Sequence, residues 1–173
     1  MYPTRRVKFA LKEILILTAC AAIGLVIAFA LNTFVLISAR VTSGSMYAAI
    51  PPQSRVFGIR TPFAARRFDR GDIVVVASPL PDLFSEPVVK RIVGLPGEQI
   101  AIISGIVHID GVPLHEYYLA DTATQSPDFA PFVIPNDHFF IMGDNRLTSR
   151  DSRHWGAVCA TTIIGRIIVI NTP

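Results

Sequence analysis

The feature that most constrains this chain is an apolar run near its N-terminus. From Ile14 to Leu31 the sequence reads ILILTACAAIGLVIAFAL, in which only Thr18 is polar, and FVLI continues the run to Ile37. About 20 apolar residues in a helix span the roughly 30 Å core of a bilayer. A buried core helix rarely stays apolar on every face for so long, and a cleavable signal peptide has a shorter apolar region and a small-x-small site that ISAR does not supply. We therefore predict a retained transmembrane helix over 14–37.

The charges beside this run predict its orientation. Residues 1–12 contain no acid and four basic residues: Arg5, Arg6, Lys8 and Lys12. The positive-inside rule then predicts a cytoplasmic flank over 1–13 and an extracytoplasmic domain over 38–173. The net charge is +3 and the flank supplies +4, so the remainder of the chain sums to −1. We therefore expect no nucleic-acid-binding surface.

The two cysteines predict neither a disulfide framework nor a zinc site. Cys20 lies inside the apolar run and Cys159 lies near the C-terminus, so the two thiols cannot readily meet, and the spacing fits no zinc motif. We expect no metal and no cofactor. A domain of about 135 residues can bury a sufficient core without such links.

Beyond residue 40 the pattern is that of β-strands. Short β-branched runs alternate with Gly and Pro turns: GDIVVVAS (71–78), PVVKRIVGLPG (87–97), QIAIISGIVHIDGVPL (99–114), DHFFIMGDN (137–145) and TTIIGRIIVI (161–170). The third run reads as two strands joined at Ser104-Gly105, followed by a turn at Asp110-Gly111, and Gly165 indicates a bulge or a close backbone approach. The pattern predicts a mainly β, compact sandwich or barrel-like domain. The segments 60–70 and 116–132 stay unassigned, and the second resembles a surface loop.

The stretch VTSGSMYAAI (41–50) offers two hydroxyls, Ser43 and Ser45, on either side of a glycine. Serine is a weak nucleophile without a base. None of the four histidines, at 108, 115, 138 and 154, has neighbours that single it out as that base.

Lys90 is the most unusual cation of the chain. In an alternating strand it shares a face with Val88 and Ile92. If that face is buried, desolvation lowers the pKa of the amine, and a neutral amine is a competent general base. The alternative is an ordinary strand lysine whose head group reaches water, and the pattern leaves both open.

A third cluster, GDNRLTSRDSRHWG (143–156), mixes carboxylates and guanidiniums. Polar clusters are usually solvated loops, but this one follows the buried-looking FFIM run and ends at Trp155-Gly156. Apolar residues at both ends favour an ordered loop, whose shape an ion-pair network can fix.

In their order along the chain, four motifs resemble the conserved boxes of bacterial type I signal peptidases: SGSM (43–46), GDIVVV (71–76), KRIVGLPGE (90–98) and GDNRLTSRDSRHWG (143–156). Those enzymes are membrane-anchored serine proteases with a Ser–Lys dyad. The resemblance covers nearly all of 41–170. It implies the signal peptidase fold, a LexA-like Ser–Lys peptidase fold, behind a single membrane anchor.

The resemblance also implies roles. Ser45 matches the nucleophile, Lys90 the general base, and Ser43 the residue whose hydroxyl forms the oxyanion hole with the Ser45 backbone N–H. Ser149 matches the serine that orients the lysine amine. Two ion pairs are implied that would brace this loop: Arg91 with Asp144, and Asp151 with Arg153. Gly143 and Asn145 fit the turn because both tolerate a positive φ.

By the same resemblance, the substrate is an exported preprotein bound as an added β-strand, with small residues in shallow pockets before the cut. Val88 and Val89 would line those pockets and pair with the substrate backbone, and Met46 would line the primary pocket. Segment 60–70 would lie at the membrane surface. The partners implied are the preprotein and the lipid bilayer, without nucleic acid, and the enzyme would be a monomer of the bacterial inner membrane.

The sequence departs from the family after the nucleophile, where Ala48-Ala49 stands in place of the usual Pro-Thr. One alternative is a conjugation-system peptidase of the same clan that matures pilin-like substrates. Others are a catalytically silent relative that binds exported chains, and a tethered β-domain of structural role.

Overall fold

The structure is a computed structural model. It describes residues 4–47, 49–61, 68–78, 86–119 and 126–172, and only the backbone of residues 4–11. The chain divides into two compact units, residues 1–36 and residues 37–173. The position of Ala48 and most of segment 60–70, namely 62–67, lie outside the described residues, so the expectations about them stay predictions.

The first unit is the helix α1 (Thr4–Ala30), followed by a π-helical turn over Leu31–Val35. The 24 residues from Lys12 to Val35 are long and apolar enough to cross a membrane. The apolar run extends beyond the helical part. Leu36 is already the first residue of strand β1, and the Ile37 side chain is buried. The helical part of the predicted span 14–37 therefore ends at Val35.

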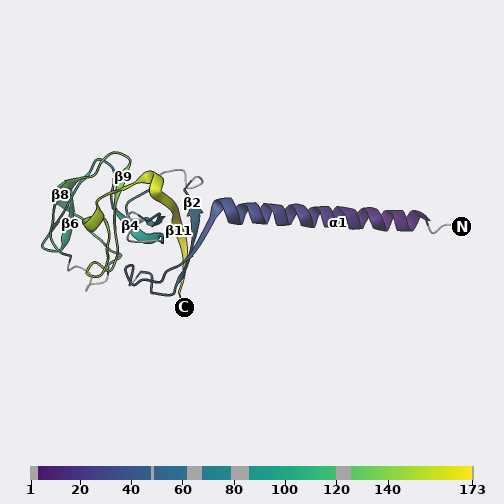
Figure 1. The fold of residues 1–173 in the computed structure, drawn as a ribbon, viewed down its shortest axis with the longest axis horizontal. Helices are drawn as coiled ribbons and strands as arrows, with labels where there is room; N and C mark the ends of the chain where they lie inside the picture. Colours follow the sequence, from purple (N-terminus) through teal and green to yellow (C-terminus); the bar gives the residue numbers. More distant parts are fainter. Residues whose placement is uncertain (1–3, 48, 62–67, 79–85, 120–125, 173) are drawn as a thin grey trace. The chain divides into compact units, whose positions relative to one another are not determined.

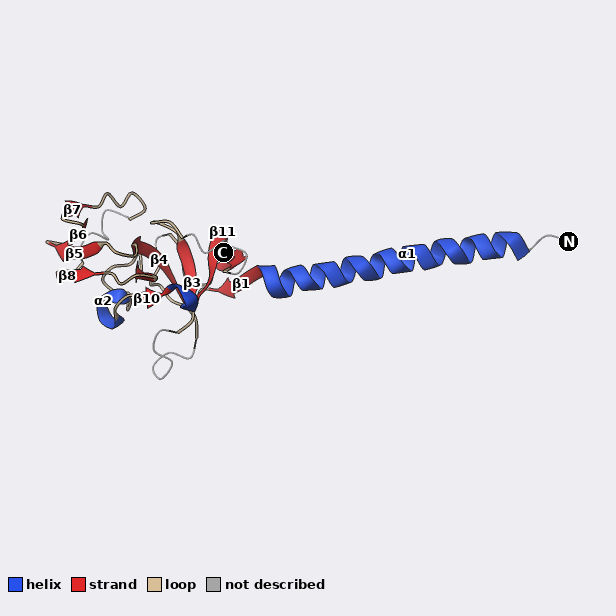
Figure 2. Ribbon diagram, turned by 90° about the horizontal axis from the view of Figure 1, so that it is seen from above, coloured by secondary structure: helices blue, strands red, loops and turns tan. Residues whose placement is uncertain are grey.

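The second unit is mainly β, as predicted (Figure 1). A seven-stranded sheet has the order β1-β2-β11-β3-β4-β9-β10. Its strands are β1 (Leu36–Arg40), β2 (Arg55–Arg60), β3 (Ile73–Val76), β4 (Val88–Gly94), β9 (His138–Met142), β10 (Val158–Cys159) and β11 (Ile163–Asn171). A four-stranded sheet has the order β7-β6-β5-β8, made of β5 (Gln99–Ile103), β6 (Ile106–Ile109), β7 (Val112–Pro113) and β8 (Phe129–Val133). In Figure 2, β5 to β8 gather at one end of this unit, and the C-terminus lies beside β11 at the other.

Strand β9 is buried on both faces, which explains its unbroken apolar sequence. Phe139 and Ile141 point into one core cluster, and Phe140 and Met142 point into another. The neighbouring strand β4 also contributes to both clusters, through Ile92 and then Val93. The pair β4–β9 therefore forms the rigid centre of the domain, and Lys90 lies on β4.

The predicted turns of the 99–114 segment are present. Ser104 and Gly105 have φ of 52° and 82°, and Asp110 and Gly111 have φ of 51° and 81°. Two consecutive positive φ values are those of the tight hairpin turns that match the twist of the flanking strands. These turns set the β5–β6 and β6–β7 pairing. The two predicted strands and the turn after them are therefore confirmed, and the short strand β7 after that turn is an addition.

Gly165 behaves as predicted, because both expected features occur together. The register of β11 against β3 shifts between Ile163 and Gly165. A Cβ added at Gly165 would also collide with the carbonyl of Ile59 on β2. The interpretation of 116–132 as a surface loop is wrong in part, since strand β8 begins inside it at Phe129 and pairs with β5. Residues 120–125 of that segment lie outside the described ones.

Candidate active site

The bend after β1, residues 41–50, is anchored by apolar side chains and carries its hydroxyls nearer the surface. Met46 is fully buried in a cluster with Val41, Ile50 and Val56. A one-turn hydrogen bond joins the Ile50 N–H to the Met46 carbonyl at 2.7 Å. This anchoring fixes the backbone just after Ser45, whose side chain stays partly accessible.

Strand β4 brings the predicted base to the predicted nucleophile. Lys90 Nζ lies 2.7 Å from Ser45 Oγ, and Ser43 Oγ lies 3.2 Å from the same atom. Lys90 is only 4% exposed. Of the two readings of this lysine, the structure therefore supports the buried one.

Burial changes the chemistry of the Lys90 amine. Desolvation is the main cause that lowers the pKa of Lys90 from 10.5 to about 8. The carboxylates of Asp151 and Asp144 oppose this change, and the guanidinium of Arg153 adds to it. At pH 7 about a tenth of the amine is therefore neutral, which is the form that can accept a proton.

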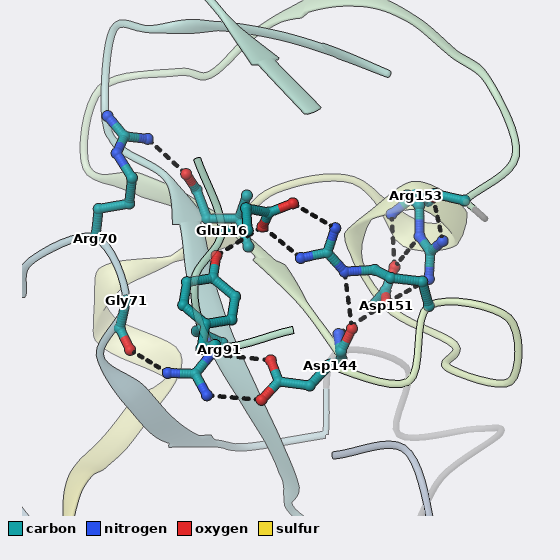
Figure 3. Close-up of polar contacts among 12 residues, drawn as sticks. Arg70, Gly71, Arg91, Glu116, Asp144, Asp151 and Arg153 are labelled. Carbon is teal, nitrogen blue, oxygen red and sulfur yellow. Dashed lines mark hydrogen bonds and ion pairs between the residues drawn. The ribbon is translucent and has the colours of Figure 1, made fainter. Parts of the chain in front are cut away.

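The first expected ion pair is present and buried (Figure 3). Arg91 donates from Nε and Nη2 to the two carboxylate oxygens of Asp144, at 2.9 and 2.6 Å. Its Nη1 donates to the carbonyl of Gly71 at 2.8 Å. The pairing is bidentate, the geometry in which an arginine fixes orientation as well as charge.

The second expected ion pair, Asp151 with Arg153, is also present. Arg153 Nε and Nη2 each lie 2.8 Å from a carboxylate oxygen of Asp151. The same carboxylate accepts from the Gly143 N–H at 3.0 Å and caps the short helix α2 (Ser152–Trp155). Burial raises the pKa of Asp151, but the contacts with Arg153, Gly143 and the Ser149 hydroxyl outweigh it and hold the pKa below its ordinary value.

The 143–156 loop touches the backbone at the predicted nucleophile, Ser45, directly. The Asn145 N–H donates to the Ser45 carbonyl at 3.0 Å, and the Asn145 side chain donates to the Gly44 carbonyl at 3.2 Å. A Cβ added at Gly143 would collide with the Ser45 carbonyl and with Ser149. Neither Gly143 nor Asn145 has a positive φ, so the sequence-based reason given for them was wrong, and close approach is the reason for this glycine.

Ser149 lies in this loop, but its hydroxyl makes no hydrogen bond to the Lys90 amine in the structure. The Ser149 hydroxyl is buried beside Asp151 and makes no well-formed hydrogen bond within the described part of the chain. The hydrogen bond of Lys90 goes to Ser45. The expected orienting role of Ser149 therefore stays a prediction.

A cavity of about 450 Å³ opens beside Ser45 and Lys90. Of the three predicted lining residues, Val88 and Val89 belong to it, and Met46 does not, because its side chain is fully buried in the core. Further lining residues that the sequence did not predict come from three segments: Arg40, Val41 and Thr42; Glu86 and Pro87; Thr148, Arg150 and Trp155. The cavity therefore runs between the end of β1 and the start of β4.

The sequence also failed to predict a third buried ion pair near this loop. Glu116 pairs with Arg146, which has only 1% of its side chain exposed. Glu116 lies 30 residues before its partner, in the segment read as a surface loop. Apolar periodicity carries no signal for a charge pair at this separation.

Comparison with known proteins gives a consistent result. The family model described as signal peptidase, peptidase S26, matches residues 13–171. A probable signal peptidase I-2 of Synechocystis sp. is 32% identical over 150 residues, which cover 84% of this chain and 67% of that protein. A signal peptidase I of Leptolyngbya laminosa is 35% identical over 156 residues, covering 85% and 74%. Signal peptidase I S of Bacillus subtilis is 34% identical over 152 residues, covering 83% and 80%.

Among solved structures, the crystal structure of a signal peptidase I from Enterococcus faecalis matches with a TM-score of 0.51 and 28% identity. The match covers 60% of this chain and 97% of that one.

Proposed function

The chain belongs to the peptidase S26 family of signal peptidases, and on that premise we propose that Ser45 and Lys90 are the nucleophile and the general base with which it cleaves signal peptides. The activity is that of a membrane-anchored serine-type endopeptidase acting on exported preproteins. One observation supports the assignment of these two residues above all others. It is the 2.7 Å approach of a desolvated amine to a serine hydroxyl at the wall of a cavity.

The proposed reaction begins when the neutral Lys90 amine takes the proton of Ser45 Oγ. The alkoxide oxygen bonds to the scissile carbonyl carbon, and a tetrahedral intermediate forms. The ammonium then returns its proton to the leaving amine as the peptide bond breaks, which leaves an acyl-enzyme. Water hydrolyses that ester, with Lys90 accepting the proton of the water and giving it back to Ser45.

The oxyanion of the intermediate requires two donors that converge on one point. We assign these to the Ser43 hydroxyl and the Ser45 backbone N–H, because the two belong to one bend and the hydroxyl already lies near the reacting atom. A donor of this kind contributes about 3 kcal/mol to the transition state. We assign to Ser149 the holding of the amine in line, a role that its buried hydroxyl supports.

The substrate would lie as an extended strand along the cavity, between residues 40–43 and 86–89. Its small side chains would contact Val88 and Val89. The helix over 14–35 would cross the membrane once, with the basic residues before it in the cytoplasm and the catalytic unit outside. The catalytic unit would work as a monomer.

The test is cleavage by the detergent-solubilised full chain of a preprotein whose signal ends in Ala-x-Ala. Wild type should release the mature protein with a new N-terminus after the second alanine. Ser45→Ala should abolish release and keep the wild-type melting temperature. Cleavage by Ser45→Ala at a rate near wild type would remove Ser45 as the nucleophile. A panel of ordinary signal peptides beside a pilin-like substrate would separate general processing from a dedicated peptidase.

A further inference from the structure

The pair between Glu116 and Arg146 belongs to a closed ring of contacts behind the active site. Arg146 donates from Nη1 and Nη2 to the two oxygens of Glu116, at 2.8 and 2.5 Å. The Tyr118 hydroxyl donates to Glu116 Oε1 at 2.6 Å. The guanidinium of Arg91 lies over the Tyr118 ring, 4.1 Å from its centre. Since Arg91 also pairs with Asp144, the ring of contacts links the guanidinium of Arg91 to that of Arg146.

This ring closes on the turn at residues 143–146. Arg146 Nε donates to the Gly143 carbonyl at 3.1 Å, and the Arg146 N–H donates to the Asp144 carbonyl at 3.1 Å. Asp144 at the other end of the ring is held by Arg91. Between these two anchors lies Asn145, whose N–H holds the carbonyl of the nucleophile Ser45. The turn that clamps the nucleophile is therefore fixed from both sides.

The charge states of the ring suit this work. Burial raises the pKa of Tyr118, and Glu116 raises it further, so the hydroxyl stays protonated and donates. Burial alone would lower the pKa of Arg146, but the contact with Glu116 outweighs it, so the guanidinium stays charged. In Figure 3 the carboxylate of Glu116 lies above the paired Arg91 and Asp144, where several dashed contacts meet.

Stability is a weak reason for such an arrangement. Replacing a buried ion pair by apolar residues of similar volume is often neutral or stabilising. A ring of bidentate contacts does, however, fix direction, which apolar packing does not. A reacting group misplaced by about 1 Å can lower a rate a hundredfold.

We infer that Glu116 and Tyr118 are positioning residues of the peptidase, which act through Arg146 and Arg91 to hold the turn that clamps Ser45. The inference rests on the proposed role of Ser45. It adds a third segment, residues 116–118, to the two that carry the reacting and bracing groups.

The first experiment measures kcat and KM for preprotein cleavage by Glu116→Gln in the full chain. The expected result is a kcat lower by about ten- to a hundredfold with KM changed less than about twofold, since Glu116 does not line the substrate cavity. A paired variant, Glu116→Leu with Arg146→Met, removes both charges and so avoids the unpaired buried guanidinium. The melting temperature of the paired variant should be closer to that of wild type than the melting temperature of Glu116→Gln is, while its kcat stays low. A kcat that returns together with the melting temperature would overturn the inference.

Tyr118→Phe is a milder variant. It keeps the aromatic ring under the Arg91 guanidinium and removes the hydroxyl that donates to Glu116. Its kcat should fall by about three- to tenfold. The matched control is Tyr117→Phe, since Tyr117 is 82% exposed. Equal kcat values for these two variants would also overturn the inference. If wild type cleaves and Ser45→Ala does not, such results count against the ring alone, whereas a wild type that fails to cleave counts against the proposed function.

Discussion

The bend that carries the proposed nucleophile (residues 41–50) and the bracing loop (residues 143–156) form one site by opposite means. The bend carries Ser43 and Ser45, and backbone contacts and a few buried apolar side chains hold it. The loop contains buried carboxylates and guanidiniums whose partners lie inside the domain. The bend leaves its hydroxyls accessible to a substrate, and the hydrogen bonds from the loop hold the backbone of the bend in position.

From this comparison we expect that the residues proposed to react can be changed separately from the residues that set the geometry. A single bidentate ion pair fixes direction, but it adds little net stability when its desolvation is counted. We therefore expect changes in the bend to alter chemistry without unfolding the domain. Changes in the loop should alter both.

The largest expected effect is that of Lys90→Met. Methionine has a similar volume and no titratable group, so Ser45 loses its proton acceptor, and kcat/KM should fall by at least about 10⁴-fold, as expected for loss of a catalytic group. Initial rates with the preprotein at high enzyme concentration measure this. Activity of Lys90→Met within tenfold of wild type would exclude Lys90 as the base.

The same variant should gain stability. The lowered pKa of Lys90 means that the folded state tolerates the ammonium less well than the unfolded state does. This penalty is fully present below about pH 8 and disappears as the pH rises towards 10.5. Lys90→Met should therefore raise the free energy of unfolding by on the order of 3 kcal/mol at pH 7, and by less at pH 10, as thermal melts at the two pH values would reveal.

Asp151→Asn tests the loop side of the comparison. Asparagine keeps the helix cap but removes the charge that compensates the buried Arg153, so the cost should be about 3–5 kcal/mol of folding stability. The control is Arg166→Gln, which breaks the more exposed pair between Arg166 and Asp72 and should cost at most about 1 kcal/mol. Equal costs in chemical denaturation would mean that the loop's ion pair is no more important to the fold than a surface pair.

The pH profile reports on Lys90, the proposed base that faces the bend. In the proposed mechanism the neutral amine is the active form, so kcat/KM should rise about tenfold per pH unit below the pKa of Lys90 and level off above about pH 8. Asp151 raises that pKa, so Asp151→Asn should move the rising limb to lower pH. A limb that stays in place, or moves upward, would contradict the assignment of this pKa to Lys90.

Much of the fold could be predicted from the sequence, because most of its strands carry a signal in their own residues and in the turns beside them. The Gly-containing turns and β-branched runs predicted β3 to β6, β9 and β11. Strand β8 was missed because Pro131 interrupts its sequence, and proline argues against a central strand; as the outer strand of its sheet, β8 tolerates it. Strand β1 was missed at its start because its apolar residues continue those of the helix.

The site was readable to the extent that its residues form short motifs. Ser45, Lys90 and the two braces through Arg91 and Asp151 stand in such motifs, and the structure brings them together. The burial of Lys90 was one of two open readings, because alternation assigns a face to a residue and does not say what covers it. Glu116 could not be predicted, because its partner is fixed only by the tertiary fold.

The smallest expected effect comes from Gly44→Ala, and it separates the two regions most finely. Gly44 has no positive φ, and an added Cβ would meet only Pro52 at 3.9 Å. The folding stability should therefore change by less than about 1 kcal/mol, and can rise because alanine restricts the unfolded chain. The matched variant is Gly143→Ala, whose Cβ would collide with both Ser149 and the Ser45 carbonyl, so its melting temperature should fall clearly. If Gly44→Ala destabilised the domain as much as Gly143→Ala does, the bend would be held as tightly as the loop, and the division between a reacting region and a shaping region would be wrong.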